Sequence, residues 1–150
     1  DAKAKTYILK FLRDESSPLR IKALQVLTRE RLSFALKPIV ALAGADDFQE
    51  RPFEEKREIF LALGELGQEG VLPMLREQLM KRYWFQKGNE KESVQLAALG
   101  LGRVRSKSAL QLLEEARSQK KGSEIRSVLD QAIASHVARQ RSAGRGEVGA

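Results

Sequence analysis

The stretch from Lys56 to Ala116 contains one pattern twice, and this repetition constrains the fold more than any other feature of the chain. Each copy has an apolar helix that ends in Ala-Leu-Gly, then a short polar joint, then a second apolar helix. The two Ala-Leu-Gly segments, 62–64 and 98–100, lie 36 residues apart. A period in the thirties with helical spacing inside each copy is typical of stacked helical hairpins, because one hairpin cannot bury its own apolar face.

The pattern extends toward both ends of the chain. A large aliphatic residue recurs at four equivalent positions: Leu27, Leu63, Leu99 and Ile133. A second series lies about one helical turn earlier: Leu24, Phe60, Leu96 and Leu129. The sequence therefore predicts an all-α, right-handed superhelix (an α-solenoid) of about four stacked antiparallel hairpins. In this register Leu63 and Leu99 occupy equivalent buried positions.

Turn chemistry predicts where the helices begin and end. We expect helices at about 3–14, 18–29, 33–45, 52–67, 71–83, 89–104, 106–120 and 123–141. Polar residues that can accept hydrogen bonds from the first turn of a helix stand at the start of four of them: Ser16 or Ser17, Asn89, Ser106 and Ser123. Gly122, after two lysines, is expected to close the helix that precedes 123. Asn89 and Glu92 also have the spacing of a capping box. Between two helices, Phe48 is expected to plug the space between repeats.

We expect residues 1–141 to form the repeat domain and residues 142–150 to form a flexible tail, because the tail has no apolar periodicity. The helix at 3–14 is interpreted as the second helix of a hairpin whose first helix is missing. The chain also begins at Asp1, without an initiator methionine. We therefore expect a C-terminal fragment of a longer protein.

Composition limits the possible function classes. The chain is 42% hydrophobic and 31% charged, which is sufficient for a folded core. It has no cysteine, which excludes disulfides and thiolate chemistry and favours a cytoplasmic location. No apolar run is long enough to span a bilayer, and no signal-peptide pattern is present. We therefore expect a cytoplasmic protein that is not associated with a membrane.

The residues that commonly carry catalysis are sparse. His136 is the only histidine, and no carboxylates have metal-ligand spacing, so the sequence predicts no transition-metal site. Gly100 and Gly102 follow a helix rather than a strand and lack the third glycine of a dinucleotide-binding loop. A Walker-type lysine motif is also missing. We therefore expect a protein that is not an enzyme and binds no cofactor.

The copies at 56–79 and 92–116 resemble HEAT-like repeats of the type first described in phycobilisome lyases. Arg20 and Lys56 stand where that repeat usually has an arginine, whereas Glu92 departs from the pattern. The resemblance implies an α-solenoid but little about function, because such repeats serve many roles. HEAT-like iron hydroxylases carry paired His-Glu motifs as metal ligands, and this chain has none. The resemblance also leaves open an accessory role as a tetrapyrrole lyase.

The resemblance implies that the second helix of each hairpin lines the concave side. Candidate partner-binding residues on or beside these helices are Lys37, Arg76, Glu77, Lys81, Arg82, Lys87, Glu114 and Arg117. The expected function is a non-catalytic protein–protein interaction or scaffolding module, acting as a monomer. The alternative is a nucleic-acid-binding module with a basic concave face, which the net charge of +7 allows.

Two further features have both a structural and a functional interpretation. Tyr83, Trp84 and Phe85 lie among cations and could stack bases or anchor a peptide. We interpret Trp84 and Phe85 as a buried wedge, with Lys87 and Gly88 as the exposed tip. The C-terminal region is also rich in basic residues, namely Arg117, Lys120, Lys121, Arg126, Arg139, Arg141 and Arg145. We interpret them as the polar surface of an end cap, although a nucleic acid could use them.

Overall fold

A computed structural model describes the backbone of residues 2–83 and 87–148. Within these residues every regular element is an α-helix or a short 3-10 helix, and no strand is present, which confirms the all-α class. The predicted wedge of Trp84 and Phe85 lies outside the described residues, as does the side chain of Lys87.

The chain divides into two compact units, residues 1–67 and 68–150. The first contains α1 (Ala2–Phe11), α2 (Ser17–Arg29), η1 (Ser33–Ala35), α3 (Leu36–Ala43), η2 (Phe48–Glu50) and α4 (Phe53–Gly67). The second contains η3 (Gln68–Val71), α5 (Leu72–Met80), α6 (Lys87–Leu101), α7 (Lys107–Gln119) and α8 (Ser123–Val148).

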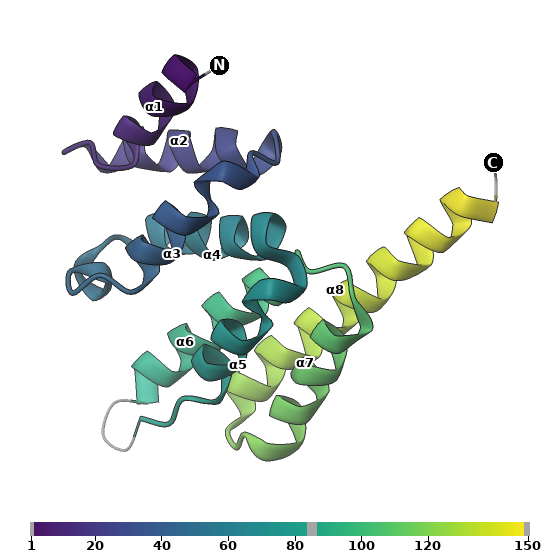
Figure 1. Cartoon of the computed structure of the whole chain (residues 1–150). Coiled ribbons are helices and arrows are strands. Elements are labelled where there is room, and N and C mark those ends of the chain that lie inside the picture. Colours follow the sequence, from purple (N-terminus) through teal and green to yellow (C-terminus); the bar gives the residue numbers. More distant parts are fainter. Residues whose placement is uncertain (1, 84–86, 149–150) are drawn as a thin grey trace. The chain divides into compact units, whose positions relative to one another are not determined.

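The first unit is built around α4, which packs against both α2 and α3 (Figure 1). Every residue of α4 from Ile59 to Glu65 is buried, so this helix is covered on all sides. Phe48, predicted to be a plug, is 5% exposed and packs against Phe60 with ring centroids 5.9 Å apart. The Nζ atom of Lys56 lies 5.8 Å from the centroid of the Phe48 ring. Burial of Phe48 is therefore confirmed within this unit.

In the second unit α5 packs mainly against α6, α7 packs mainly against α8, and α6 packs beside α8. In the first unit α3 packs in the same way against α4. The second helix of each predicted hairpin thus packs extensively on the first helix of the next one. This arrangement is possible because a helix such as α6 is buried over much of its circumference, at Val94, Leu96–Ala98 and Leu101.

The repeat register is confirmed for one of the two predicted series. Leu24, Phe60, Leu96 and Leu129 are all buried, each with 2% exposure or less. In the other series Leu27 and Leu63 are fully buried, but Leu99 and Ile133 are only half-buried, so the predicted equivalence of Leu63 and Leu99 is wrong. Because successive helical residues turn by about 100°, Leu99 shares one side of α6 with Gln95 and Gly102, which are also only partly buried. Leu63 avoids this exposure because α4 is covered all round.

Several helix ends differ from the prediction. Ser16 and Ser106 occupy N-cap positions, but neither side chain makes a capping hydrogen bond. The backbone N–H of Ser16 donates to Oδ1 of Asp14 at 2.8 Å. The capping box at Asn89 is wrong, because α6 begins at Lys87 and places Asn89 inside its first turn.

In the joint before α8, the predicted role of Gly122 is confirmed, whereas the predicted cap at Ser123 is wrong. Gly122 has a φ of +105°, which side-chain-bearing residues rarely adopt. Ser123 is the first residue of α8 rather than its cap. The helix continues to Val148, past the predicted end near Arg141, because no proline interrupts residues 142–148. The C-terminal half of α8 extends beyond α5, α6 and α7 (Figure 1).

Candidate functional site

In the second unit, helices α5 and α7 border a shallow groove with a volume of about 400 Å³. Its lining residues come from both helices: Leu72, Pro73, Arg76, Ser108, Gln111, Leu112 and Glu115. Leu72, Pro73 and Leu112 make the groove mainly apolar. The volume falls within the range of about 300–1,000 Å³ that is common for binding sites.

The groove results from the helical periods of α5 and α7. In α5, Leu75 and Leu79 are fully buried, and Leu72 and Arg76 lie along one edge of this buried stripe, where they line the groove. In α7 the buried stripe is Ala109, Leu113 and Ala116, and it likewise leaves Ser108, Leu112 and Glu115 on the side that lines the groove. The core positions therefore determine which residues face it.

One ion pair crosses the groove. Nη2 of Arg76 donates to Oε1 of Glu115 at 2.8 Å. Both side chains are partly exposed, so the pair contributes at most about 1 kcal/mol to stability. Because the two charges compensate each other, the groove has apolar walls and nearly no net charge.

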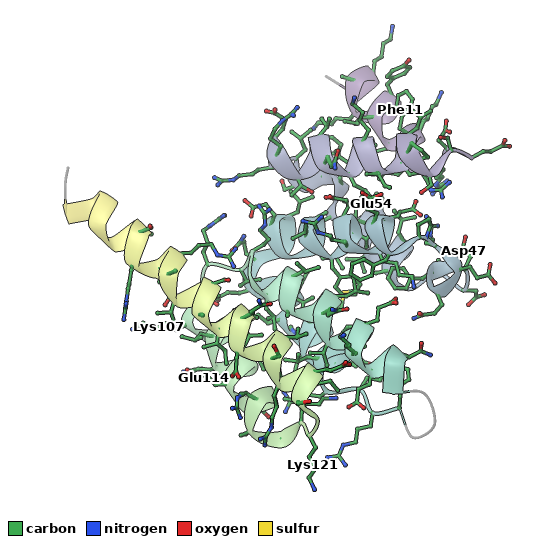
Figure 2. The ribbon with its side chains drawn as sticks, turned by 180° about the vertical axis from the view of Figure 1, so that it is seen from behind. Phe11, Asp47, Glu54, Lys107, Glu114 and Lys121 are labelled. Carbon is green, nitrogen blue, oxygen red and sulfur yellow. The ribbon has the colours of Figure 1, made fainter. Side chains whose placement is uncertain are left out.

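The structure separates the predicted partner-binding residues. Among them only Arg76 lines the groove. Glu77 and Glu114 are exposed on α5 and α7, outside the lining (Figure 2 labels Glu114). Nε of Arg117 donates to Oδ1 of Asp130 on α8 at 2.7 Å, so this side chain is directed toward α8.

The remaining predicted residues lie elsewhere. Lys37 is exposed on α3, in the first unit. Lys81 and Arg82 are exposed after the last residue of α5, and Nζ of Lys81 lies 5.4 Å from the centroid of the Tyr83 ring.

The sequence analysis did not single out Leu72, Pro73, Leu112 or Glu115. A signal for them was present, because the 36-residue period aligns Leu72 with Ser108 and Arg76 with Leu112. This register places residues of the two second helices beside one another, but their exposure, and therefore the groove, is decided by the tertiary structure.

A second cavity, of about 440 Å³, lies in the first unit beside a cluster of charges. The centre of the cluster is Glu55, which is 0% exposed. Its carboxylate accepts hydrogen bonds from the guanidinium of Arg20 and, at 3.2 Å, from Nη1 of Arg51. The hydrogen bond from Arg20 to Glu55 is the main reason that the pKa of Arg20 lies above its ordinary value, although burial opposes the shift. Arg20 therefore remains charged at any pH used for experiments, and the cluster joins α2 to α4.

The basic residues near the C-terminus are largely engaged in internal interactions. Lys120 is 6% exposed, and its Nζ donates to Oε1 of Glu90 and to the carbonyl of Lys81, both at 2.9 Å. Nε of Arg126 donates to the carbonyl of Lys120 at 3.3 Å. Lys120 thus connects the ends of α5, α6 and α7.

His136 is buried, with 3% exposure, and its Nε2 lies 3.2 Å from the carbonyl oxygen of Val104. A carbonyl can only accept, so Nε2 carries the proton and donates it. The described residues include no cluster of three or more His, Asp or Glu side chains that could hold a metal ion. In the same part of the chain, none of the helices combines the length and the apolar character needed to cross a membrane.

Comparison of this chain with protein-family models, with curated proteins and with solved structures gives no match.

Proposed function

We propose that this chain is a non-catalytic protein-interaction module, built as a right-handed HEAT-like α-solenoid, and that the groove between α5 and α7 binds its partner. The groove carries this proposal. It lies between two second helices of successive repeats, and it combines an apolar lining with one polar pair across it.

The chemistry of the groove favours one kind of occupant, the apolar side of a helix from another protein. Leu72, Pro73 and Leu112 offer contacts to aliphatic side chains. A polyanion is disfavoured there, because Arg76 is already neutralised by Glu115. Binding of an amphipathic helix in a groove uses apolar side chains at spacings of three, four and seven residues.

Replacing Leu112 with aspartate is expected to weaken binding of such helices at least about tenfold, because a buried carboxylate without a partner is costly to desolvate. The measurement begins by selecting displayed amphipathic peptides of about 15 residues on the full chain. Selected peptides are then titrated against the wild type and Leu112→Asp by calorimetry, after circular dichroism has shown that both proteins fold.

Leu19→Asp is the matched control, because Leu19 is a 43% exposed leucine on α2 in the first unit. Its affinity for the selected peptides should equal that of the wild type. The proposal fails if no peptide is enriched, or if the selected peptides bind Leu112→Asp as tightly as the wild type. Self-association that Leu112→Asp abolishes would instead identify a second copy of the chain as the occupant.

A further inference from the structure

The turn that joins α6 to α7 carries three cations in five residues. Arg103, Arg105 and Lys107 are exposed, whereas Val104 between the first two is 1% exposed. The alternation directs Val104 into the core and the basic side chains toward solvent.

Three side chain–backbone contacts hold this turn in place. Nε2 of Gln68 donates to the carbonyl of Arg103 at 3.0 Å, and the N–H of Arg105 donates to Oε1 of Gln68 at 2.9 Å. Nε2 of the buried His136 donates to the carbonyl of Val104. Gln68 itself has a φ of +49°, which residues other than glycine seldom adopt. Side chains of η3 and α8 therefore hold the backbone of three consecutive residues, 103–105, by hydrogen bonds.

Helix α8 adds a fourth cation to the turn. Nη2 of Arg139 lies so close to Gly102 that a Cβ atom at this position would be 2.7 Å away. The missing side chain of Gly102 thus leaves room for the guanidinium of Arg139. We call Arg103, Arg105, Lys107 and Arg139 the basic turn.

Two cations of the basic turn, Arg103 and Lys107, differ from other basic residues of the second unit in their ion pairing. Arg76, Arg117 and Lys120 are each paired with a carboxylate. Within the described residues, neither Arg103 nor Lys107 has a carboxylate partner. Ion pairing within the described chain therefore does not account for the charges of Arg103 and Lys107.

Most of the net positive charge of the chain also belongs to the second unit. Residues 68–150 contain 15 Lys and Arg against nine Asp and Glu, a net charge of +6 out of +7 for the whole chain. The basic turn lies at the start of α7, and Lys121 follows the other end of this helix, as the labels of Lys107 and Lys121 show (Figure 2). The charges of Arg103 and Lys107 thus lie close together in the sequence, in and beside a turn whose backbone is fixed.

We propose that the basic turn binds the phosphate backbone of a nucleic acid. Arginine guanidinium groups donate paired hydrogen bonds to phosphate oxygens, and neutralising phosphates releases condensed counterions. A fixed turn loses little conformational freedom when it binds. The site is distinct from the α5–α7 groove, whose charges are compensated.

A lipid surface fits this site less well. Peripheral membrane binding normally combines basic residues with apolar side chains that insert into the interface. The large exposed hydrophobic residues of the described chain are Tyr7, Leu19, Val40 and Phe53, and all four belong to the first unit. Contact through phosphates alone is independent of base sequence, so we expect binding without sequence selectivity.

The double variant Arg103→Ala/Lys107→Ala tests this proposal. Arg105 stays intact, because it makes another interaction within the chain. The affinity of the full chain for a fluorescein-labelled DNA duplex of about 20 base pairs is measured by anisotropy at salt concentrations from about 50 to 200 mM. We expect the variant to bind at least about tenfold more weakly at low salt. The slope of log K against log salt should fall by about two, since each lost phosphate contact removes about one.

The matched control is Lys22→Ala/Lys37→Ala, which removes the same charge from two exposed lysines of the first unit. It should weaken binding by less than about twofold, and Lys107→Glu should reproduce the loss with a single change. The proposal is overturned if the wild type does not bind DNA at the lowest salt, or if both double variants lose equal affinity. Tighter binding to phosphatidylserine vesicles than to DNA would also overturn it.

Discussion

Replacing Glu55 with alanine is expected to lower the free energy of unfolding by about 3–5 kcal/mol, because it removes the one buried carboxylate that Arg20 and Arg51 share, and these arginines keep only weaker contacts with the carbonyl of Asp14 and the exposed carboxylate of Asp47. Glu55 is 0% exposed, and the side chains of its two partners, Arg20 and Arg51, are 17% and 12% exposed. Removing this carboxylate also removes hydrogen bonds that join α2 to α4. The remaining guanidinium groups would be poorly solvated and would repel each other.

The measurement is urea unfolding followed by circular dichroism. Glu54→Ala provides the matched control, since Glu54 is the preceding residue, is exposed and lies in the first turn of α4 (Figure 2). Its loss should cost no more than about 1 kcal/mol, the value of an acidic residue near a helix N-terminus. Equal effects of the two substitutions would contradict the buried arrangement of Arg20, Glu55 and Arg51.

Leu96→Ala is expected to destabilise the chain by about 2–5 kcal/mol, whereas Leu99→Ala, in the same helix, should cost much less. Leu96 is 1% exposed, and Leu99 is only half-buried. The two substitutions remove the same atoms from α6, so the difference between them reports burial alone.

The free energy of unfolding of both variants is measured with urea. Leu63→Ala is a useful third variant, because Leu63 aligns with Leu99 in the sequence repeat but is fully buried in α4. We expect Leu63→Ala to resemble Leu96→Ala rather than Leu99→Ala. A loss for Leu99→Ala as large as that for Leu63→Ala would restore the equivalence that the repeat predicts and would refute the orientation of α6.

Much of the architecture could be predicted from the sequence, because it depends on local patterns. Apolar residues at helical spacing indicated the helices, and the series Leu24, Phe60, Leu96 and Leu129 identified positions that are all buried. Gly122 marked the joint before α8, because its left-handed backbone is strongly disfavoured for residues with a side chain.

Helix capping was predicted less well, because it depends on which hydrogen-bond donors and acceptors lie near the first turn of each helix. Ser16 and Ser106 stand at the predicted N-cap positions, yet neither side chain caps its helix. At Ser16 one of the usual donors is missing, because Pro18, the second residue of α2, has no backbone N–H. A residue type thus indicates that a helix can start, while the neighbouring groups decide which hydrogen bonds form.

The candidate sites depended on tertiary structure even more strongly. Residue types suggested that Arg76, Arg117 and Lys120 were available to a partner or a nucleic acid, but each has a carboxylate partner on another helix. The basic residues Arg103, Arg105 and Lys107 were not among the predicted binding residues, because the partners of this turn, Gln68 and His136, lie more than 30 residues away in the sequence.

The sequence by itself determined the helical class, the approximate helix positions and one register of buried residues, since these follow from the period of apolar side chains along the chain. Only the tertiary structure decided which side of each helix is covered and which charges are paired. Leu99 is only half-buried whereas Leu63 is fully buried, and within the part of the chain that the structure describes Arg103 lacks the carboxylate partner that Arg76 has. Burial and ion pairing depend on neighbours that are distant in the sequence, and a repeat pattern does not specify them.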